Sequence, residues 1–102
     1  MAKSGTPFVK EFNRYTPLML TVAGGDQNLD CLKLMLQNGA NFICKDDFDN
    51  NLLHIAAKNN CNKMIDYIAK NLKINIFERN KEGETALNIC QNLKNEQGIA
   101  TL

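Results

Sequence analysis

At 102 residues, the chain has the length of a single domain. Its 44% hydrophobic and 23% charged residues are typical of an ordinary globular protein and exclude a disordered tail or a membrane protein. Twelve Lys and Arg against eleven Asp and Glu leave a formal charge of +1, without a basic run that could follow a phosphate backbone. We therefore expect neither nucleic acid nor a membrane as a partner.

The first ten residues are polar and contain glycine, unlike a secretory leader, so the sequence predicts an intracellular protein, cytoplasmic or nuclear. No two of its four cysteines are close together in the sequence, whereas structural zinc ligands usually come in close pairs. We therefore expect inert, packed thiols and no metal or other cofactor. The alternative is a thiol-based metal or redox sensor, which requires at least two thiols to approach in space. These cysteines are Cys31, Cys44, Cys61 and Cys90.

Apolar residues fall in short helical clusters that come in pairs. Residues 18–23 and 29–36 form the first pair, and residues 52–57 and 64–69 repeat the same layout. Polar links rich in Gly, Asn and Asp follow, and such residues favour turns. The links occupy residues 38–41, 45–50 and 79–84. The predicted unit is a helix, a tight turn, a second helix and a longer looping link.

The layout repeats with a nearly fixed period. Leu18, Leu53 and Leu87 hold equivalent positions, and the two intervals between them differ by a single residue. Repetition at this spacing is typical of a solenoid. One unit of this size cannot bury its apolar face alone, so each unit has to be stabilised by stacking on its neighbours.

Short segments of each unit resemble the ankyrin repeat, a family with a 33-residue period and a Thr-Pro-Leu-His pattern. The first unit contains Thr16-Pro17-Leu18-Met19-Leu20, followed by a second helix and turn that end in Asn38-Gly39-Ala40-Asn41. The second contains Asn51-Leu52-Leu53-His54-Ile55-Ala56-Ala57, and the third Glu84-Thr85-Ala86-Leu87. The resemblance covers nearly all of residues 11–102.

The resemblance implies an all-α ankyrin-repeat solenoid of stacked helix-turn-helix units with short β-hairpin-like finger loops. We divide the chain into an N-terminal segment (1–10), repeat 1 (11–45), repeat 2 (46–79) and a shortened or truncated repeat 3 (80–102). The second helix of repeat 3 should begin near Glu96, and the chain is either short at this end or part of a longer protein. We expect a monomer.

Several residues depart from the family pattern or fit it closely. Arg14 and Asp49 stand where the family has glycine at the tip of the link, which predicts distorted turns. Lys73 replaces the glycine after the second helix of repeat 2, whereas Gly39 fits the left-handed conformation that ends a helix. Gly98 is expected to weaken the last helix.

His54 is the only histidine, so it cannot share a metal with a second imidazole. It falls at the histidine position of the ankyrin pattern, which implies a hydrogen bond to loop backbone that fixes neighbouring units. Cys61 lies on the far side of the next turn, but no third residue is suggested that would orient a nucleophile and base. We therefore expect no enzymatic activity.

With metal binding and catalysis set aside, we expect the chain to recognise another protein. The resemblance implies that the partner binds to the concave face and the finger tips. Phe12, Tyr15 and Phe48 are the expected anchors, because binding energy concentrates in a few large side chains. The alternatives are local: Phe12 and Tyr15 cover the end of the stack, and Phe48 packs against the adjacent finger. The full predicted set is Phe12, Asn13, Tyr15, Asp47, Phe48, Asn50, Lys58, Asn59, Lys81, Glu82, Glu84 and Asn92.

The sequence thus predicts an adaptor, scaffold or inhibitor module that binds a partner protein reversibly. A second alternative is a purely structural segment within a larger repeat array. The sequence does not name the partner, because one scaffold of this kind binds unrelated proteins.

Overall fold

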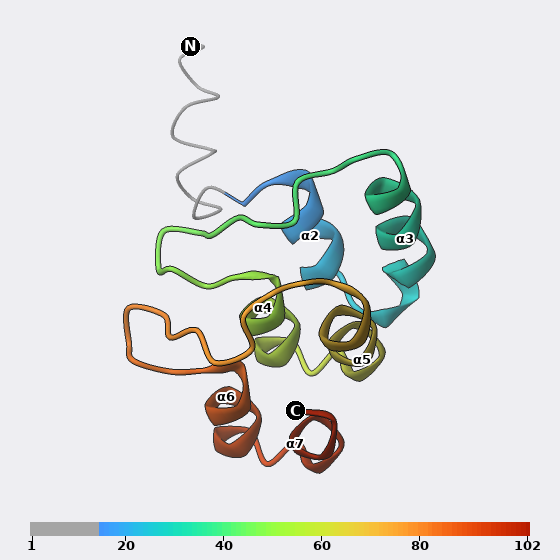
Figure 1. The fold of residues 1–102 in the computed structure, drawn as a ribbon. Coiled ribbons are helices and arrows are strands. Elements are labelled where there is room, and N and C mark those ends of the chain that lie inside the picture. Colours follow the sequence, from blue (N-terminus) through green and yellow to red (C-terminus); the bar gives the residue numbers. More distant parts are fainter. Residues whose placement is uncertain (1–14) are drawn as a thin grey trace, which may run out of the picture.

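A computed structural model describes residues 15–102, which form six α-helices and one 3₁₀ turn (Figure 1). The helices come in three pairs, and no strand occurs within these residues. The first pair is α2 (Pro17–Ala23) and α3 (Leu29–Gln37), with the 3₁₀ turn η1 (Asp26–Asn28) between them; the second is α4 (Leu52–Lys58) and α5 (Asn62–Asn71); the third is α6 (Ala86–Asn92) and α7 (Glu96–Thr101).

The pairs stack in chain order. Helix α4 packs against α2 on one side and α6 on the other, while α5 packs against α7 in a parallel layer. Figure 1 shows the two long links between pairs projecting to the same side of the stack. This arrangement confirms the predicted helical solenoid.

The first helix of each pair begins with the same cap. In all three, the side chain of the N-cap residue accepts a hydrogen bond from the amide three residues later, and that residue's side chain accepts one from the N-cap amide. Such a reciprocal cap satisfies two backbone donors that a helix start leaves unpaired. The N-cap residues are Thr16, Asn51 and Thr85, paired with Met19, His54 and Asn88.

The core lies between the two helix layers, where sixteen apolar residues of the described chain are buried. Leu18 and Leu53 are 2% and 1% exposed, as the repeat predicts. Leu87 holds the same position after its cap but is only half-buried. Leu18 and Leu53 lie in pairs that are followed by another described pair, whereas Leu87 lies in the last one, where no described helix packs beyond α6.

In the tight turn inside each pair, one residue has a positive φ angle. Gly25, Asn60 and Lys94 have φ values of 111°, 54° and 58° and recur with the period of the repeat. Gly39 ends α3 with a φ of 87°, which confirms its predicted role. Position 73 needs no glycine, because Leu72, the residue that follows α5, already has an extended backbone.

The tip of the first described finger is regular, so the predicted distortion at Asp49 is wrong. Asp49 adopts a left-handed φ of 62°, close to the 77° of Gly83 in the next finger. The two turns also share their backbone hydrogen bonds, since Asp46 N donates to Asn50 O as Asn80 N donates to Glu84 O. Aspartate tolerates this conformation better than most residues. Arg14 lies outside the described residues.

Helix α7 begins at Glu96, as predicted, but the interpretation of Gly98 as a weak point was incomplete. Gly98 is buried, and a Cβ atom there would lie 2.7 Å from Cys90 Sγ and 2.9 Å from Asn95 Nδ2. The absence of a side chain therefore allows α7 to approach α6 closely.

This contact predicts that Gly98→Ala lowers the free energy of unfolding, although alanine favours helices by about 1 kcal/mol over glycine. Overpacking costs about 1–3 kcal/mol, which outweighs that gain. In a Cys90→Ala background the nearest obstacle is gone and only the contact with Asn95 remains, so Gly98→Ala should cost less there than in the parent chain. Urea denaturation of the four proteins measures both effects. A stabilising Gly98→Ala in the parent chain would disprove the close contact.

Candidate protein-binding surface

The two described fingers are joined to each other directly. Lys81 N donates to the Phe48 carbonyl at 2.9 Å, and Asn80 Nδ2 donates to Asn50 Oδ1 at 2.8 Å. Successive finger tips are therefore held at a fixed spacing, which is what a preformed binding edge requires.

A buried polar residue holds the base of each finger. Asp46 is only 6% exposed, and its carboxylate accepts hydrogen bonds from Phe48 N (2.9 Å), Asn50 N (2.9 Å) and Asn50 Nδ2 (3.1 Å). Asn80 fills the equivalent place in the next finger, where its Oδ1 accepts from Glu82 N and Glu84 N. Each finger turn is thus closed by one internal acceptor.

His54 connects the second helix pair to the finger at residues 80–84, which falls in the predicted repeat 3 and is called the third finger below. Its Nδ1 accepts from Asn51 N at 3.1 Å, so we assign the ring proton to Nε2, which lies 2.9 Å from the Glu84 carbonyl. The ring is 1% exposed and is closed off from solvent. The structural role that the family resemblance implies for His54 is confirmed.

Four of the predicted site residues meet at a shallow hollow of about 220 Å³ on the α4–α6 side of the stack. Lys58 comes from the end of α4, Glu82 and Glu84 from the third finger, and Asn92 from the end of α6. Ile89 and Leu93 complete its lining. Asn92 Nδ2 donates to Glu84 Oε2 at 3.2 Å, whereas Lys58 and Glu82 form no ion pair within residues 15–102.

Other predicted residues lie near this surface with different degrees of exposure. The Phe48 side chain is 47% exposed at the finger tip, and Lys81 and Asn59 are exposed. Asn59 Nδ2 donates to the Ile55 carbonyl at 2.8 Å, and Asp47 is partly exposed. Phe12 and Asn13 fall outside the described residues.

Two predicted site residues are buried wholly or in part. Asn50 is 2% exposed and its amide is shared between Asp46 and Asn80, so its predicted contact with a partner is wrong. Tyr15 is half-buried against the core, which fits the local alternative for that side chain. Burial, with a smaller contribution from the negative charge of Asp46, raises the pKa of the Tyr15 hydroxyl.

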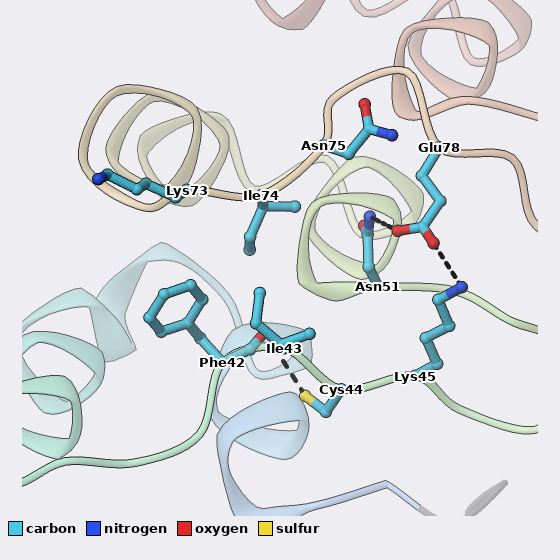
Figure 2. Close-up of a pocket in the computed structure, with 9 residues that line it drawn as sticks. All are labelled: Phe42, Ile43, Cys44, Lys45, Asn51, Lys73, Ile74, Asn75 and Glu78. Atoms are coloured by element: carbon cyan, nitrogen blue, oxygen red, sulfur yellow. Dashed lines mark hydrogen bonds and ion pairs between the residues drawn. The ribbon is translucent and has the colours of Figure 1, made fainter.

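The sequence did not predict a second and larger hollow, of about 440 Å³, where the link after α3 meets the link after α5 (Figure 2). Apolar side chains supply much of its lining, and polar side chains lie toward its ends. We name it the junction hollow. It is lined by Phe42, Ile43, Cys44, Lys45, Asn51, Lys73, Ile74, Asn75 and Glu78.

Glu78 joins the two links at one end of the junction hollow. Its carboxylate forms an ion pair with Lys45 and accepts a hydrogen bond from Asn51 Nδ2 at 3.1 Å (Figure 2). The hydrogen bond with Lys45 lowers the pKa of Glu78, and the same contact raises the pKa of Lys45.

The lowered pKa of Glu78 predicts a pH-dependent contribution to stability. A carboxyl group whose pKa is lower in the folded state stabilises the fold above its unfolded pKa, about 4.3 for glutamate, and loses this effect as the pH falls through its folded pKa. Glu78→Gln should therefore cost up to about 1 kcal/mol near neutral pH and nothing in strong acid. Urea denaturation of both proteins across this range tests it. A constant difference at all pH values would contradict it.

The four cysteines are free thiols. Burial raises the pKa of Cys44, Cys61 and Cys90, so their reactive thiolate form is disfavoured. Within residues 15–102, no group of three or more His, Cys, Asp or Glu side chains is arranged to hold a metal ion. These observations give no support to the alternative of a thiol-based sensor.

Stacked helix pairs with repeated caps, repeated turns and joined fingers define a helical-repeat protein. The family model described as ankyrin repeats (3 copies) matches residues 18–102, so the chain belongs to the ankyrin repeat family. Members of this family generally act as protein–protein interaction modules and are typically not enzymes. None of the curated proteins compared matches the chain. Among residues 15–102, every helix is too short or too polar to cross a membrane.

Proposed function

We propose that the chain is an adaptor, scaffold or inhibitor module that holds a partner protein with its concave face and finger tips. The observation that carries this proposal is the exposure of Phe48 and Glu82 on two fingers that are hydrogen-bonded to each other, with Lys58 exposed at the end of α4. Within residues 15–102, no buried side-chain nitrogen or oxygen lacks a hydrogen-bond partner. The framework behind the surface is therefore complete without a ligand.

A preformed surface lowers the cost of binding, because fewer side chains and loops have to be ordered when the partner arrives. Phe48 is the proposed anchor, since large aromatic side chains at the centre of an interface contribute most of the binding energy. Lys58 and Glu82 carry opposite charges, so the partner should present both signs around an apolar centre.

The proposed surface includes Tyr15, Asp47, Phe48, Lys58, Asn59, Lys81, Glu82, Glu84 and Asn92, and it extends by prediction to Phe12 and Asn13. The division into repeats at residues 11–45, 46–79 and 80–102 is part of the same proposal.

Site-directed photo-crosslinking tests the proposal. A photoreactive phenylalanine analogue replaces Phe48 in one protein and Leu34, which is 59% exposed on α3, in a control. We expect a discrete protein adduct from position 48 that position 34 does not give. Lys58→Ala should weaken that adduct, whereas Lys70→Ala on α5 should not.

Adducts of the same pattern from both positions, or adducts from position 48 that Lys58→Ala leaves unchanged, would count against the concave face. That result would favour the alternative in which this segment is structural and lies within a larger repeat array.

A further inference from the structure

The junction hollow lies at the junction of two repeats and cannot be formed by either alone. Residues 42–45 leave the first helix pair and residues 73–78 leave the second, and the two segments face each other across the cavity (Figure 2). None of the residues proposed for the concave face lines it. A ligand bound there would therefore use a surface separate from the proposed protein-binding face.

The chemistry of the lining divides the hollow into three parts. Phe42, Ile43 and Ile74 form an apolar middle, with Ile74 directed toward Ile43 (Figure 2). At one end the charge of Glu78 is compensated by Lys45. At the other end lies Lys73, which is exposed and forms no ion pair within the described residues.

Exposed apolar side chains extend this surface with the period of the repeat. Ile43 is 63% exposed and Phe77 is 75% exposed, and they stand one repeat period apart at equivalent places in the two links. Each is held by the same local turn, since Asn41 Oδ1 accepts from Ile43 N and Asn75 Oδ1 accepts from Phe77 N, both at 3.0 Å. Exposed apolar patches mark interaction sites, and Ile43 belongs to the lining of the junction hollow itself.

We propose that the junction hollow binds a short segment of a partner protein that carries a large apolar side chain next to an acidic residue. The apolar side chain fills the space between Phe42, Ile43 and Ile74, and the neighbouring carboxylate meets the ammonium group of Lys73. A volume of about 440 Å³ is within the range of small-ligand pockets, about 300–1,000 Å³, and accommodates such a side chain. The acidic residue is assigned by charge, because Lys73 is the one lining charge without a compensating partner among the lining residues.

The test is an NMR titration of the whole chain with three probes: acetyl-Asp-Phe-Asp-amide, its uncharged Asn-flanked counterpart and its Lys-flanked counterpart. We expect saturable shifts at the amides of residues 42–45 and 73–78 with the acidic probe, with a dissociation constant of about 1 mM. The Asn-flanked probe should bind more weakly and the Lys-flanked probe weakest.

Lysine variants separate a specific contact from general attraction. Lys73→Gln should weaken binding of the acidic probe about two- to fivefold, the range expected for one exposed ion pair. Lys63→Gln, which removes an exposed lysine from α5, should leave binding unchanged. Ile43→Ser should weaken all three probes, while Lys58→Ala on the concave face should affect none.

Several results would overturn the proposal: no saturable shift at these amides, equal binding of the acidic and Lys-flanked probes, or equal effects of Lys73→Gln and Lys63→Gln. Concentration-dependent shifts of the same amides without a probe, abolished by Phe48→Ala, would overturn it too, because the occupant would then be a second copy of this chain. Lys58→Ala changes only the concave face and is expected to leave probe binding unchanged. Failure of this proposal therefore stays distinct from failure of the concave face.

Discussion

Replacing His54 with alanine is expected to lower the free energy of unfolding by about 2–4 kcal/mol. The substitution removes a buried ring and leaves the amide of Asn51 without its partner. It also removes one of the two hydrogen bonds to the carbonyl of Glu84, which still accepts from Asn80 N. These groups belong to different repeats, so the effect should reach the third finger as well as α4. Urea denaturation followed by circular dichroism measures the loss.

The matched control is Asn88→Ala, which changes the equivalent position after the next cap. Asn88 is half-buried, and the hydrogen bonds of its side chain stay within α6 and its cap. Its removal should cost about 0.5–1 kcal/mol, within the usual range for a lost cap interaction. Equal losses for the two substitutions would show that His54 acts only as a cap and does not join repeats.

Asp46→Ala is expected to cost a similar amount, about 2–4 kcal/mol, because it deletes the acceptor of three hydrogen bonds at a buried site. The donors left behind are the amides of Phe48 and Asn50 and the side-chain amide of Asn50. The finger should then lose its fixed tip, so exchange of the Lys81 amide with solvent should accelerate too.

Asp49→Gly is the control within the same turn. Asp49 holds a left-handed conformation that glycine adopts without a steric penalty, and Gly83 occupies this place in the next finger. The free energy of unfolding should stay the same or rise by up to about 1 kcal/mol. A loss at position 49 as large as the loss at position 46 would mean that the carboxylate of Asp46 has no special role.

Repetition in the sequence predicted the parts of the fold that every unit must share. The spacing of Leu18, Leu53 and Leu87 located the first helix of each pair, and the motif around His54 indicated a bond between repeats. Gly39 was predictable because roughly a third to a half of helices end with a residue in the left-handed conformation, which is usually glycine. These features depend on local pattern and period, which a single sequence displays directly.

Features that depend on contacts between fingers or between helices were harder to predict. The sequence predicts that Asn50 is a polar residue in an exposed loop. In the structure it is buried, because Asn80 of the next finger lies against it. From the sequence alone, Gly98 is expected to weaken its helix. Its role in close packing is evident only from the position of Cys90, which lies against it. Neither distance can be derived from local periodicity.

The candidate site divides in the same way. Lys58, Glu82, Glu84 and Asn92 were predicted by register and do line one hollow. The junction hollow was missed, because it forms only when two links of different repeats face each other. One signal was present in the sequence: the large apolar residues Ile43 and Phe77 recur with the repeat period, each two residues after an asparagine.

The most direct test of the stacked-repeat account is the NMR spectrum of the His54 ring in the intact chain. The account predicts a slowly exchanging proton on Nε2, an unprotonated Nδ1, and through-space contacts from the ring to Glu84 and Thr85. A ring that exchanges its proton rapidly and shows no contact with residues 84–85 would contradict it. The second helix pair and the finger that follows it would then not be joined through His54.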